Sequence, residues 1–262
     1  MKPGFLTPEE VKGTEKEPGC FRVCISIPNA GYTQVESYAN RLVNFMHLGK
    51  LEERGRILKQ VPRFEFIFNT QGRIHTALAR EGAADIALDT DSDYLYQIDD
   101  DMTCPDDLFE RLFAHNVDVV APLAFTRNYP HHAVLYRIEE GIDPDTRKPY
   151  FINRWIDKYP KDKLVECDAV GFGAVLIKRR VLEGVSKPRF MSSCGTGEDI
   201  LFCQKARSAG FKIYMDTATK LGHLSHPIEV TEEYVNRVRK DMRWEPAMNI
   251  HSKLEPSLVL GD

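Results

Sequence analysis

The sequence has no hydrophobic run long enough to cross a membrane. Its longest apolar stretch, from Ala169 to Ile177, is short and contains two glycines, whereas a membrane-spanning helix needs about 18 apolar residues. The N-terminal residues are polar and interrupted by proline and glycine, so they lack the charged and then apolar pattern of a secretory signal. These absences predict a cytoplasmic protein without a membrane span.

Paired cysteines and an excess of basic residues are also missing. Six cysteines are spread over 262 residues without a CxxC pair, which argues against a zinc knuckle or a disulfide framework and predicts buried free thiols. The 35 Lys and Arg against 39 Asp and Glu give a net charge of −4. A dedicated nucleic-acid scaffold would carry an overall basic excess. The composition therefore leaves only a local basic groove as a means of binding nucleic acid.

What the sequence does contain is an alternation of apolar strands and amphipathic helices. We expect strands at 21–27, 64–68, 94–98, 117–121, 174–177 and 211–215, and helices at 35–48, 73–88, 200–209 and 229–243. Another helix opens at Pro105. This rhythm predicts parallel strands joined by helical crossovers. The polar stretch 139–163 is an insertion that we expect to cover another part of the protein.

The strongest local signal is the segment YLYQIDDDM, in which Asp99, Asp100 and Asp101 directly follow an apolar strand. Open α/β sheets bind ligands at the carboxyl ends of their strands. Asp99 and Asp101 form a D-x-D pattern, and carboxylates this close repel each other unless a cation compensates them. Mg²⁺ and Mn²⁺ suit such oxygen ligands and also contact phosphates. The segment therefore indicates a metal-diphosphate site or, alternatively, a solvated acidic turn before a helix.

A second group of polar residues lies late in the chain. Glu198 and Asp199 open the helix ILFCQKARSAG, and His223 follows the next strand in the segment GHLSH. Either carboxylate can act as a general base or position an acceptor hydroxyl, and a neutral imidazole can complete a metal site. The alternatives are acidic residues that favour a helix start and a structural histidine.

Taken together, these segments resemble the GT-A-fold glycosyltransferases, particularly those of glycosyltransferase family two. The resemblance spans most of the chain, and the order of the motifs carries it. The matching segments are CISIPN, TALAREGAADIAL, YLYQIDDDMTCPDDLFERL, VDVVAPLAFTR, DAVGFGAVLIKRRVL and GEDILFCQKARSAGFKIYMDTATKLGH.

The resemblance implies an α/β fold with a GT-A-type, Rossmann-like, mostly parallel sheet sandwiched by helices in a single domain. A flexible segment (1–20) would precede the catalytic domain (21–228), which divides into a nucleotide-binding half (21–101) and an acceptor and sugar half (102–228). A C-terminal helix and tail (229–262) would follow.

The implied activity is that of a metal-dependent glycosyltransferase, a hexosyl- or pentosyltransferase. It would use Mn²⁺ or Mg²⁺ to move a sugar from a nucleoside diphosphate sugar, such as a UDP- or GDP-sugar, to an acceptor hydroxyl. The acceptor would be a glycan, a small molecule or a nucleic acid.

The resemblance also implies roles for single residues. Asp199 and Glu198 would be catalytic, and Asp99, Asp101 and His223 would hold the metal. The implied substrate-binding residues are Pro28, Asn29, Arg80, Asp99, Asp100, Arg127, Gly171 and Phe172.

The sequence departs from the family pattern at two places. Its first loop lacks the acidic residue that many family members have after the first strand. The second strand ends in Asn69-Thr70-Gln71-Gly72, where an aspartate is frequent, so the nucleotide base is not identified.

Two other functions remain open. QIDDDMT also fits the pattern of haloacid-dehalogenase-type phosphatases, with Asp99 as nucleophile and Asp101 as acid, although that motif normally lies on the first strand. A noncatalytic sugar-binding or nucleic-acid-binding module is the third interpretation. The basic clusters 178–180 and 237–240 fit either a phosphate backbone or a solvated surface.

Overall fold

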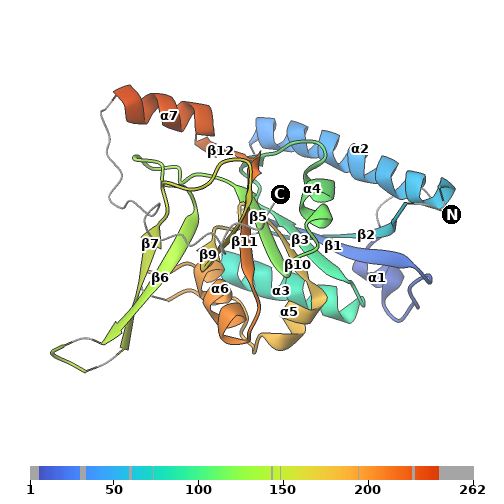
Figure 1. The fold of residues 1–262 in the computed structure, drawn as a ribbon. Coiled ribbons are helices and arrows are strands. Elements are labelled where there is room, and N and C mark those ends of the chain that lie inside the picture. The colour runs from blue at the N-terminus through green and yellow to red at the C-terminus, as the bar shows by residue number, and fades with distance from the viewer. Residues whose placement is uncertain are drawn as a thin grey trace.

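The computed structural model describes residues 6–29, 34–58, 61–72, 74–142, 144–147, 149–193, 195–225 and 228–241. Its centre is a seven-stranded sheet of order β2-β1-β3-β10-β5-β11-β8 (Figure 1). These strands are β1 (Cys20–Asn29), β2 (Arg63–Gly72), β3 (Tyr94–Ile98), β5 (Val119–Leu123), β8 (Leu164–Cys167), β10 (Ala174–Lys178) and β11 (Ile213–Lys220). All of the strands expected from the sequence are therefore present.

Five of the seven strands run in the same direction. β2, β1 and β3 are parallel, as the expected helical crossovers require, and β5 and β11 are parallel to each other. β10 is antiparallel to both β3 and β5, and β8 is antiparallel to β11. The prediction of a mostly parallel sheet is confirmed.

Helices cover both faces of this sheet and enclose two hydrophobic cores. One core joins the sheet to α3 (Thr76–Asp89), α5 (Arg179–Gly184) and α6 (Glu198–Ser208). The other joins the opposite face to α2 (Val35–Ile57) and α4 (Leu108–Ala114). Neighbouring residues of β1 show the alternation, since Cys24 belongs to the first core and Val23 to the second. The predicted fold class, a single α/β domain with a mostly parallel, Rossmann-like sheet sandwiched by helices, is confirmed.

Two small antiparallel sheets flank the central one. β4 (Met102–Thr103), β12 (Gly222–Ser225) and β13 (Ile228–Val230) form the first, and α7 (Glu232–Asp241) follows it. β7 (Pro149–Trp155), β6 (Leu135–Ile142) and β9 (Ala169–Val170) form the second. The hairpin of β6 and β7, which contains much of the insertion predicted at 139–163, projects away from the body of the molecule (Figure 1).

The helix predicted at 35–48 is present but longer, and the apolar residues of its first half are largely exposed, whereas Leu48 and Leu51 are buried in the core. Val35, Tyr38 and Met46 are 77%, 57% and 64% exposed. Ser37, Arg41 and Asn44 are buried in their place. The physical reason is that the first half of α2 lies against a loop of exposed backbone carbonyl groups, which need hydrogen-bond donors rather than apolar contacts.

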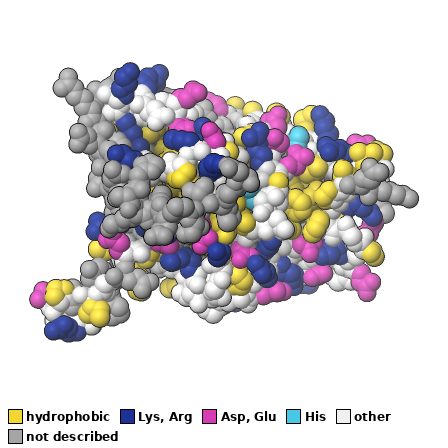
Figure 2. All heavy atoms as spheres, viewed as in Figure 1, with side chains coloured by type: hydrophobic (Ala, Val, Ile, Leu, Met, Phe, Trp, Pro, Cys, Tyr) yellow, Lys and Arg dark blue, Asp and Glu magenta, His cyan; other side chains and the backbone are white. Residues whose placement is uncertain are grey.

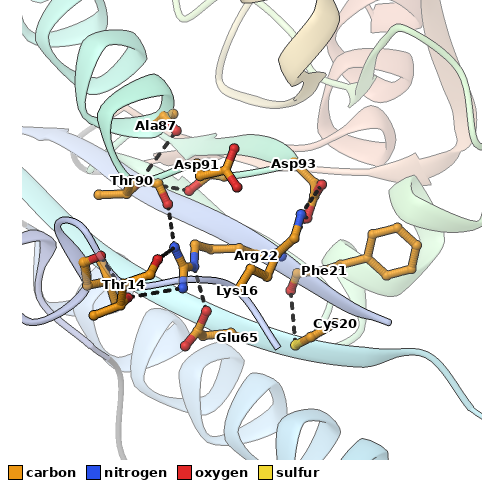
Figure 3. A network of polar contacts seen from close by, with 12 residues as sticks. Thr14, Lys16, Cys20, Phe21, Arg22, Glu65, Ala87, Thr90, Asp91 and Asp93 are labelled. Atoms are coloured by element: carbon orange, nitrogen blue, oxygen red, sulfur yellow. Dashed lines mark hydrogen bonds and ion pairs between the residues drawn. The ribbon is translucent and has the colours of Figure 1, made fainter. Parts of the chain in front are cut away.

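The segment before β1 is attached to the sheet by polar contacts around a buried arginine (Figure 3). The side chain of Arg22 is 1% exposed, and it donates to Glu65 at 2.5 Å and to the carbonyl oxygen of Thr90 at 2.7 Å. Asp93 accepts from the backbone N–H of Arg22 and from the ammonium group of Lys16. The domain division inferred from the sequence stays a prediction, and residues 6–19 are held by α1 (Pro8–Val11) and these contacts.

We expect the Arg22→Ala protein to lose about 1.5–3 kcal/mol of unfolding free energy, because a buried charged donor and its hydrogen bonds disappear. Urea titration of both proteins measures this loss. Arg154→Ala is the control, since Arg154 and its partner Glu139 are 45% and 49% exposed and such a pair contributes about 1 kcal/mol or less. Equal losses in the two variants would contradict the structural importance of Arg22.

The cysteine and membrane predictions can also be compared with the structure. Cys20, Cys24, Cys104, Cys167 and Cys203 are buried free thiols, as expected, and Cys194 lies outside the described residues. None of the described helices is both long and apolar enough to pass through a lipid bilayer. Residues 242–262, which include most of the predicted C-terminal tail, are not among those described.

Candidate functional site

The predicted site residues come from segments that meet at one edge of the central sheet. Asp99 follows the end of β3, and its backbone N–H donates to the carbonyl oxygen of Gly173 at the start of β10. Glu198 and Asp199 open α6, and His223 lies in β12 just after β11. β3, β5 and β11 run in one direction, so their carboxyl ends share an edge, which is where α/β sheets bind ligands.

Arg80 of α3 lies at the centre of this group and is 2% exposed. Its Nη2 donates to both carboxylate oxygens of Asp99, at 2.8 and 3.0 Å, and its Nε donates to Oε1 of Glu198 at 3.1 Å. Further contacts reach Gln97 Oε1 at 3.2 Å and the carbonyl oxygen of Phe172 at 3.3 Å. Arg80 therefore joins the end of β3 to the start of α6.

Phe172 supports Arg80 from the protein interior, and the preceding Gly171 lies against Val134. The ring of Phe172 is 1% exposed and packs against Phe202, while the guanidinium of Arg80 lies 5.7 Å from its centroid. A Cβ atom on Gly171 would lie 2.7 Å from Cβ of Val134, so only glycine fits this approach. The contact with donor and acceptor that the sequence assigns to these residues stays a prediction.

Asp99 and Asp199 have raised pKa values. Burial raises the pKa of Asp99 to about 7, although Arg80 acts in the opposite direction. Burial and the neighbouring charge of Glu198 raise the pKa of Asp199, whose Oδ1 accepts from the backbone N–H of Ile200 at 2.8 Å. Acids and bases with shifted pKa values are frequent at catalytic sites, which makes Asp199 a candidate base.

Asp101 and His223 form a second pair beside this group. Nε2 of His223 lies 3.4 Å from Oδ2 of Asp101. Nδ1 of His223 lies 2.8 Å from the carbonyl oxygen of Phe125, and only a protonated nitrogen can bond that oxygen. Unless the ring carries a second proton, Nε2 then presents a lone pair to the Asp101 carboxylate. Two such atoms repel each other unless a positive charge compensates them.

This donor set fits a divalent cation in its chemistry. The carboxylate oxygen of Asp101 suits both Mn²⁺ and Mg²⁺, whereas an imidazole nitrogen favours a transition metal such as Mn²⁺ over the harder Mg²⁺. The hydrogen bond to Phe125 fixes the orientation of the His223 ring. Within the described residues, no three His, Cys, Asp or Glu side chains gather around one point. Asp99, also assigned to the metal from the sequence, has both oxygens bonded to Arg80, so its role as a ligand stays a prediction.

The remaining predicted residues lie around this pair, and one of them, Arg127, is as close to Asp101 as His223 is. Arg127 is 54% exposed, with Nη1 3.4 Å from Oδ2 of Asp101, and Asp100 occupies the turn between Asp99 and Asp101. Pro28 is buried in β1 opposite Gln71. Asn29 ends β1, but its side chain lies outside the described part of the structure. Substrate contacts of these residues stay predictions.

Sequence reasoning missed the buried side of α2, which holds the acidic loop. Ser37 donates to the carbonyl oxygen of Met102 at 2.9 Å, and Nη2 of Arg41 donates to that of Asp99 at 2.6 Å. Asn40 bonds both backbone groups of Cys104, and Asn44 donates to the next two carbonyl oxygens. The signal was a set of polar residues at positions 37, 40, 41 and 44, which share one side of a helix.

Arg41 has capacity left for a further partner. It is 6% exposed, and burial lowers its pKa. Its Nη1 has no acceptor within the described part of the chain, and a buried donor without a partner is costly. The donor lies on a residue that already contacts the acidic loop, which makes Nη1 of Arg41 a candidate group for binding an anion.

Comparison with other proteins bears on the fold. Neither a protein-family model nor a curated protein matches the sequence. The chain is similar to the crystal structure of A197 from STIV, with a TM-score of 0.51 and 20% identity over 82% of this chain and 92% of that one. At this identity the likeness shows a common fold only.

Two further structures are more distant. One is GalNAc-T7 with UDP, GalNAc and Mn²⁺, with a TM-score of 0.44 and 13% identity over 80% of this chain and 45% of that chain. The other is the inositol-1-phosphate CTP transferase from T. maritima, with a TM-score of 0.45 and 13% identity over 84% and 97%. The relationship to glycosyltransferase family two therefore stays a prediction.

Proposed function

We propose that this protein is a metal-dependent glycosyltransferase that moves a sugar from a nucleoside diphosphate sugar to an acceptor hydroxyl. The observation that carries the proposal is the pair formed by Asp101 and His223, whose side-chain donor atoms lie 3.4 Å apart beside the buried group of Arg80, Glu198 and Asp199. A cation position and a candidate base thus lie at the same edge of the sheet, where ligands of α/β proteins bind.

Asp101 and His223 would hold Mn²⁺ or Mg²⁺, and the diphosphate of a UDP- or GDP-sugar would complete its ligands, since these cations are usually bound through one or two carboxylates and substrate phosphates. When bound, the metal supplies a Lewis acid that stabilises charge on the leaving diphosphate. Arg127 and Nη1 of Arg41 are the cations placed to contact the donor. Asp99 and Asp100 would position it together with the end of β1.

Asp199 would accept the proton of the acceptor hydroxyl. The pKa of Asp199 is raised toward neutral pH, and a general base is most effective when its pKa lies near the working pH. Glu198 would position the group, because its carboxylate is bonded to Arg80. Arg80 then acts as a positioning residue that holds Glu198 and Asp99 in a fixed relation.

The phosphatase alternative has no comparable support. Its nucleophile would be Asp99, but both carboxylate oxygens of Asp99 accept hydrogen bonds from Arg80. A noncatalytic module is distinguished from the transferase by turnover, as described below.

The donor is identified by thermal denaturation with UDP-, GDP-, ADP- and CDP-sugars, each with and without Mn²⁺. A ligand present at a hundred times its dissociation constant raises the unfolding free energy by about 2.7 kcal/mol. We expect one donor to stabilise the protein only when Mn²⁺ is present, and slow hydrolysis of that donor without acceptor would separate an enzyme from a binding module. Stabilisation that is independent of metal for every donor would contradict the proposal.

Substitution of Asp101 and substitution of His223 are expected to change the Mn²⁺-dependent stabilisation in different ways. Asp101→Ala should abolish the Mn²⁺-dependent stabilisation, because it removes the only carboxylate assigned wholly to the metal. His223→Ala should need at least about tenfold more Mn²⁺ and recover at high concentration, since affinity is lost and not chemistry. His47→Ala is the matched control: it removes an imidazole paired with the carboxylate of Glu110 on the surface and should leave the Mn²⁺ titration unchanged.

A further inference from the structure

The hairpin of β6 and β7, called the arm below, presents two different faces. Tyr136 pairs with Trp155 and Ile138 with Asn153, and alternate residues of a strand share one face, so Phe151, two residues before Asn153, belongs with them. These residues therefore form one face, called the inner face below. Arg137 and Arg154 belong to the other, outer face.

A cavity of about 600 Å³ lies between the inner face and the helices α5 and α6. Ile138 and Phe151 line it from the arm, and Gln204, Lys205 and Ser208 line it from α6. Nε2 of Gln204 lies 3.4 Å from Oδ1 of Asn153, which connects the two walls. One wall is therefore apolar and aromatic, whereas the other carries an amide and a hydroxyl.

Two aromatic rings of the inner face are open to solvent. Trp155 is 42% exposed and Phe151 is 57% exposed. The ring of His132 stacks on Trp155 at 4.4 Å with an interplanar angle of 13°, which holds the indole in place. Figure 2 shows hydrophobic side chains beside charged ones on the projecting arm. Four residues of extended strand separate the two rings, or about 14 Å, which is wider than a single sugar ring.

The inner face continues into the candidate catalytic site. Tyr136 lies at the base of the arm, and besides burial the negative charge of Asp199 raises the pKa of its hydroxyl. Asp199 and Gln204 belong to the same helix, five residues apart, which corresponds to about 7.5 Å along its axis. A chain that lies along the inner face toward Tyr136 would therefore approach the helix that carries the residue proposed as the base.

The charges around the cavity favour a neutral ligand. The ammonium group of Lys205 donates to the carbonyl oxygens of Ser186 and Pro188, and Arg207 pairs with Asp168 at 3.0 Å. Arg207 is thus neutralised by a carboxylate, and the hydrogen-bond donors of Lys205 are turned toward backbone carbonyl oxygens, whereas a nucleic acid would require several cations available to its phosphates. A lipid chain would require apolar residues on both walls. A neutral carbohydrate offers C–H faces to the rings and hydroxyls to the amide.

We propose that the inner face of the arm, together with Gln204 of α6, binds the acceptor, and that this acceptor is a neutral carbohydrate chain of several sugars. Aromatic rings carry a negative face that attracts the polarised C–H groups of sugars, and side-chain amides satisfy sugar hydroxyls. The inference rests on the proposed transferase function and names its acceptor class. The insertion at 139–163 would then select the acceptor.

Binding is tested without donor, so that the result does not depend on transfer. The full chain is applied with Mn²⁺ and UDP to a glycan array, and the best neutral glycan is titrated against the wild type and the variants. Phe151→Ala should weaken its binding about tenfold, whereas Phe151→Tyr, which keeps the ring, should not. Gln204→Ala should also weaken it. Arg154→Ala on the outer face is the matched control and should bind as the wild type does.

Each outcome decides the proposal. Loss of glycan binding in Phe151→Ala, with unchanged Mn²⁺-dependent donor stabilisation, supports it. No binding of any neutral glycan, or binding that Phe151→Ala leaves intact, would overturn it while leaving the proposed transferase function standing. Phe151-dependent binding of a single-stranded oligonucleotide in place of a glycan would overturn it as well. If no donor stabilises the wild type in the presence of Mn²⁺, that result counts against the transferase function and not against glycan binding by the arm.

Discussion

The Asp199→Asn protein is expected to bind metal and donor normally and to transfer sugar about 10²–10⁴-fold more slowly than the wild type. Asparagine has the size of aspartate and keeps an oxygen that accepts the N–H of Ile200, which Asp199 bonds at 2.8 Å. It lacks basicity, so the acceptor hydroxyl keeps its proton at the moment of attack. The loss should therefore appear in kcat with the acceptor identified on the arm.

The measurement compares transfer rates with the Mn²⁺-dependent thermal stabilisation by donor in the same preparations. Asp107→Asn is the matched control, because Asp107 is also an acidic residue at a helix start but is 41% exposed and paired with Arg111. It should leave both quantities unchanged. An Asp199→Asn protein that no longer binds metal and donor would show that the base has been assigned to the wrong residue.

The Arg80→Ala protein is expected to lose about 3–5 kcal/mol of unfolding free energy, the usual cost of removing one partner from a buried ion pair. The substitution leaves the carboxylates of Asp99 and Glu198 without the guanidinium that both now contact. Urea titration measures the loss. Arg111→Ala removes a surface pair with Asp107, 46% and 41% exposed, and should cost about 1 kcal/mol or less.

The effect of Arg80→Ala should depend on pH. Arg80 acts to lower the pKa of Asp99, which burial raises to about 7, so its contribution is present while Asp99 is ionised and is lost as pH falls through that value. The difference between wild type and variant should therefore be larger at pH 8 than at pH 5. A variant as stable as the wild type that binds donor weakly would instead support the phosphate contact predicted from the sequence.

The parts of the fold that were predictable are those encoded by short segments. The strands 21–27, 64–68 and 94–98 and the helices between them follow from local apolar patterns, because strand and helix place side chains with different periods. The acidic residues after β3 were recognised for the same reason. They directly follow an apolar strand, and the position of ligands at strand ends is a general property of α/β sheets.

Contacts between distant segments were not predictable. Arg80 and Glu198 are 118 residues apart in the chain, and no local pattern indicates that a helix-surface arginine will be buried between two acids. The exposed apolar residues of α2 show the same limit. Val35, Tyr38 and Met46 have the spacing of a core-facing side, but the side that becomes buried depends on what lies beneath the helix, here a loop of carbonyl groups from Asp99 to Asp106.

The hydrogen bonds from α2 to that loop have a consequence for how the site can change in evolution. Ser37, Asn40, Arg41 and Asn44 bond main-chain atoms of the loop almost exclusively, and main-chain atoms are the same whichever side chain is present. The path of the loop is thus set independently of the identity of its acidic residues. Substitutions at positions 100 and 101 should therefore leave the path of the loop unchanged, so that these two positions can vary in evolution without a change of fold.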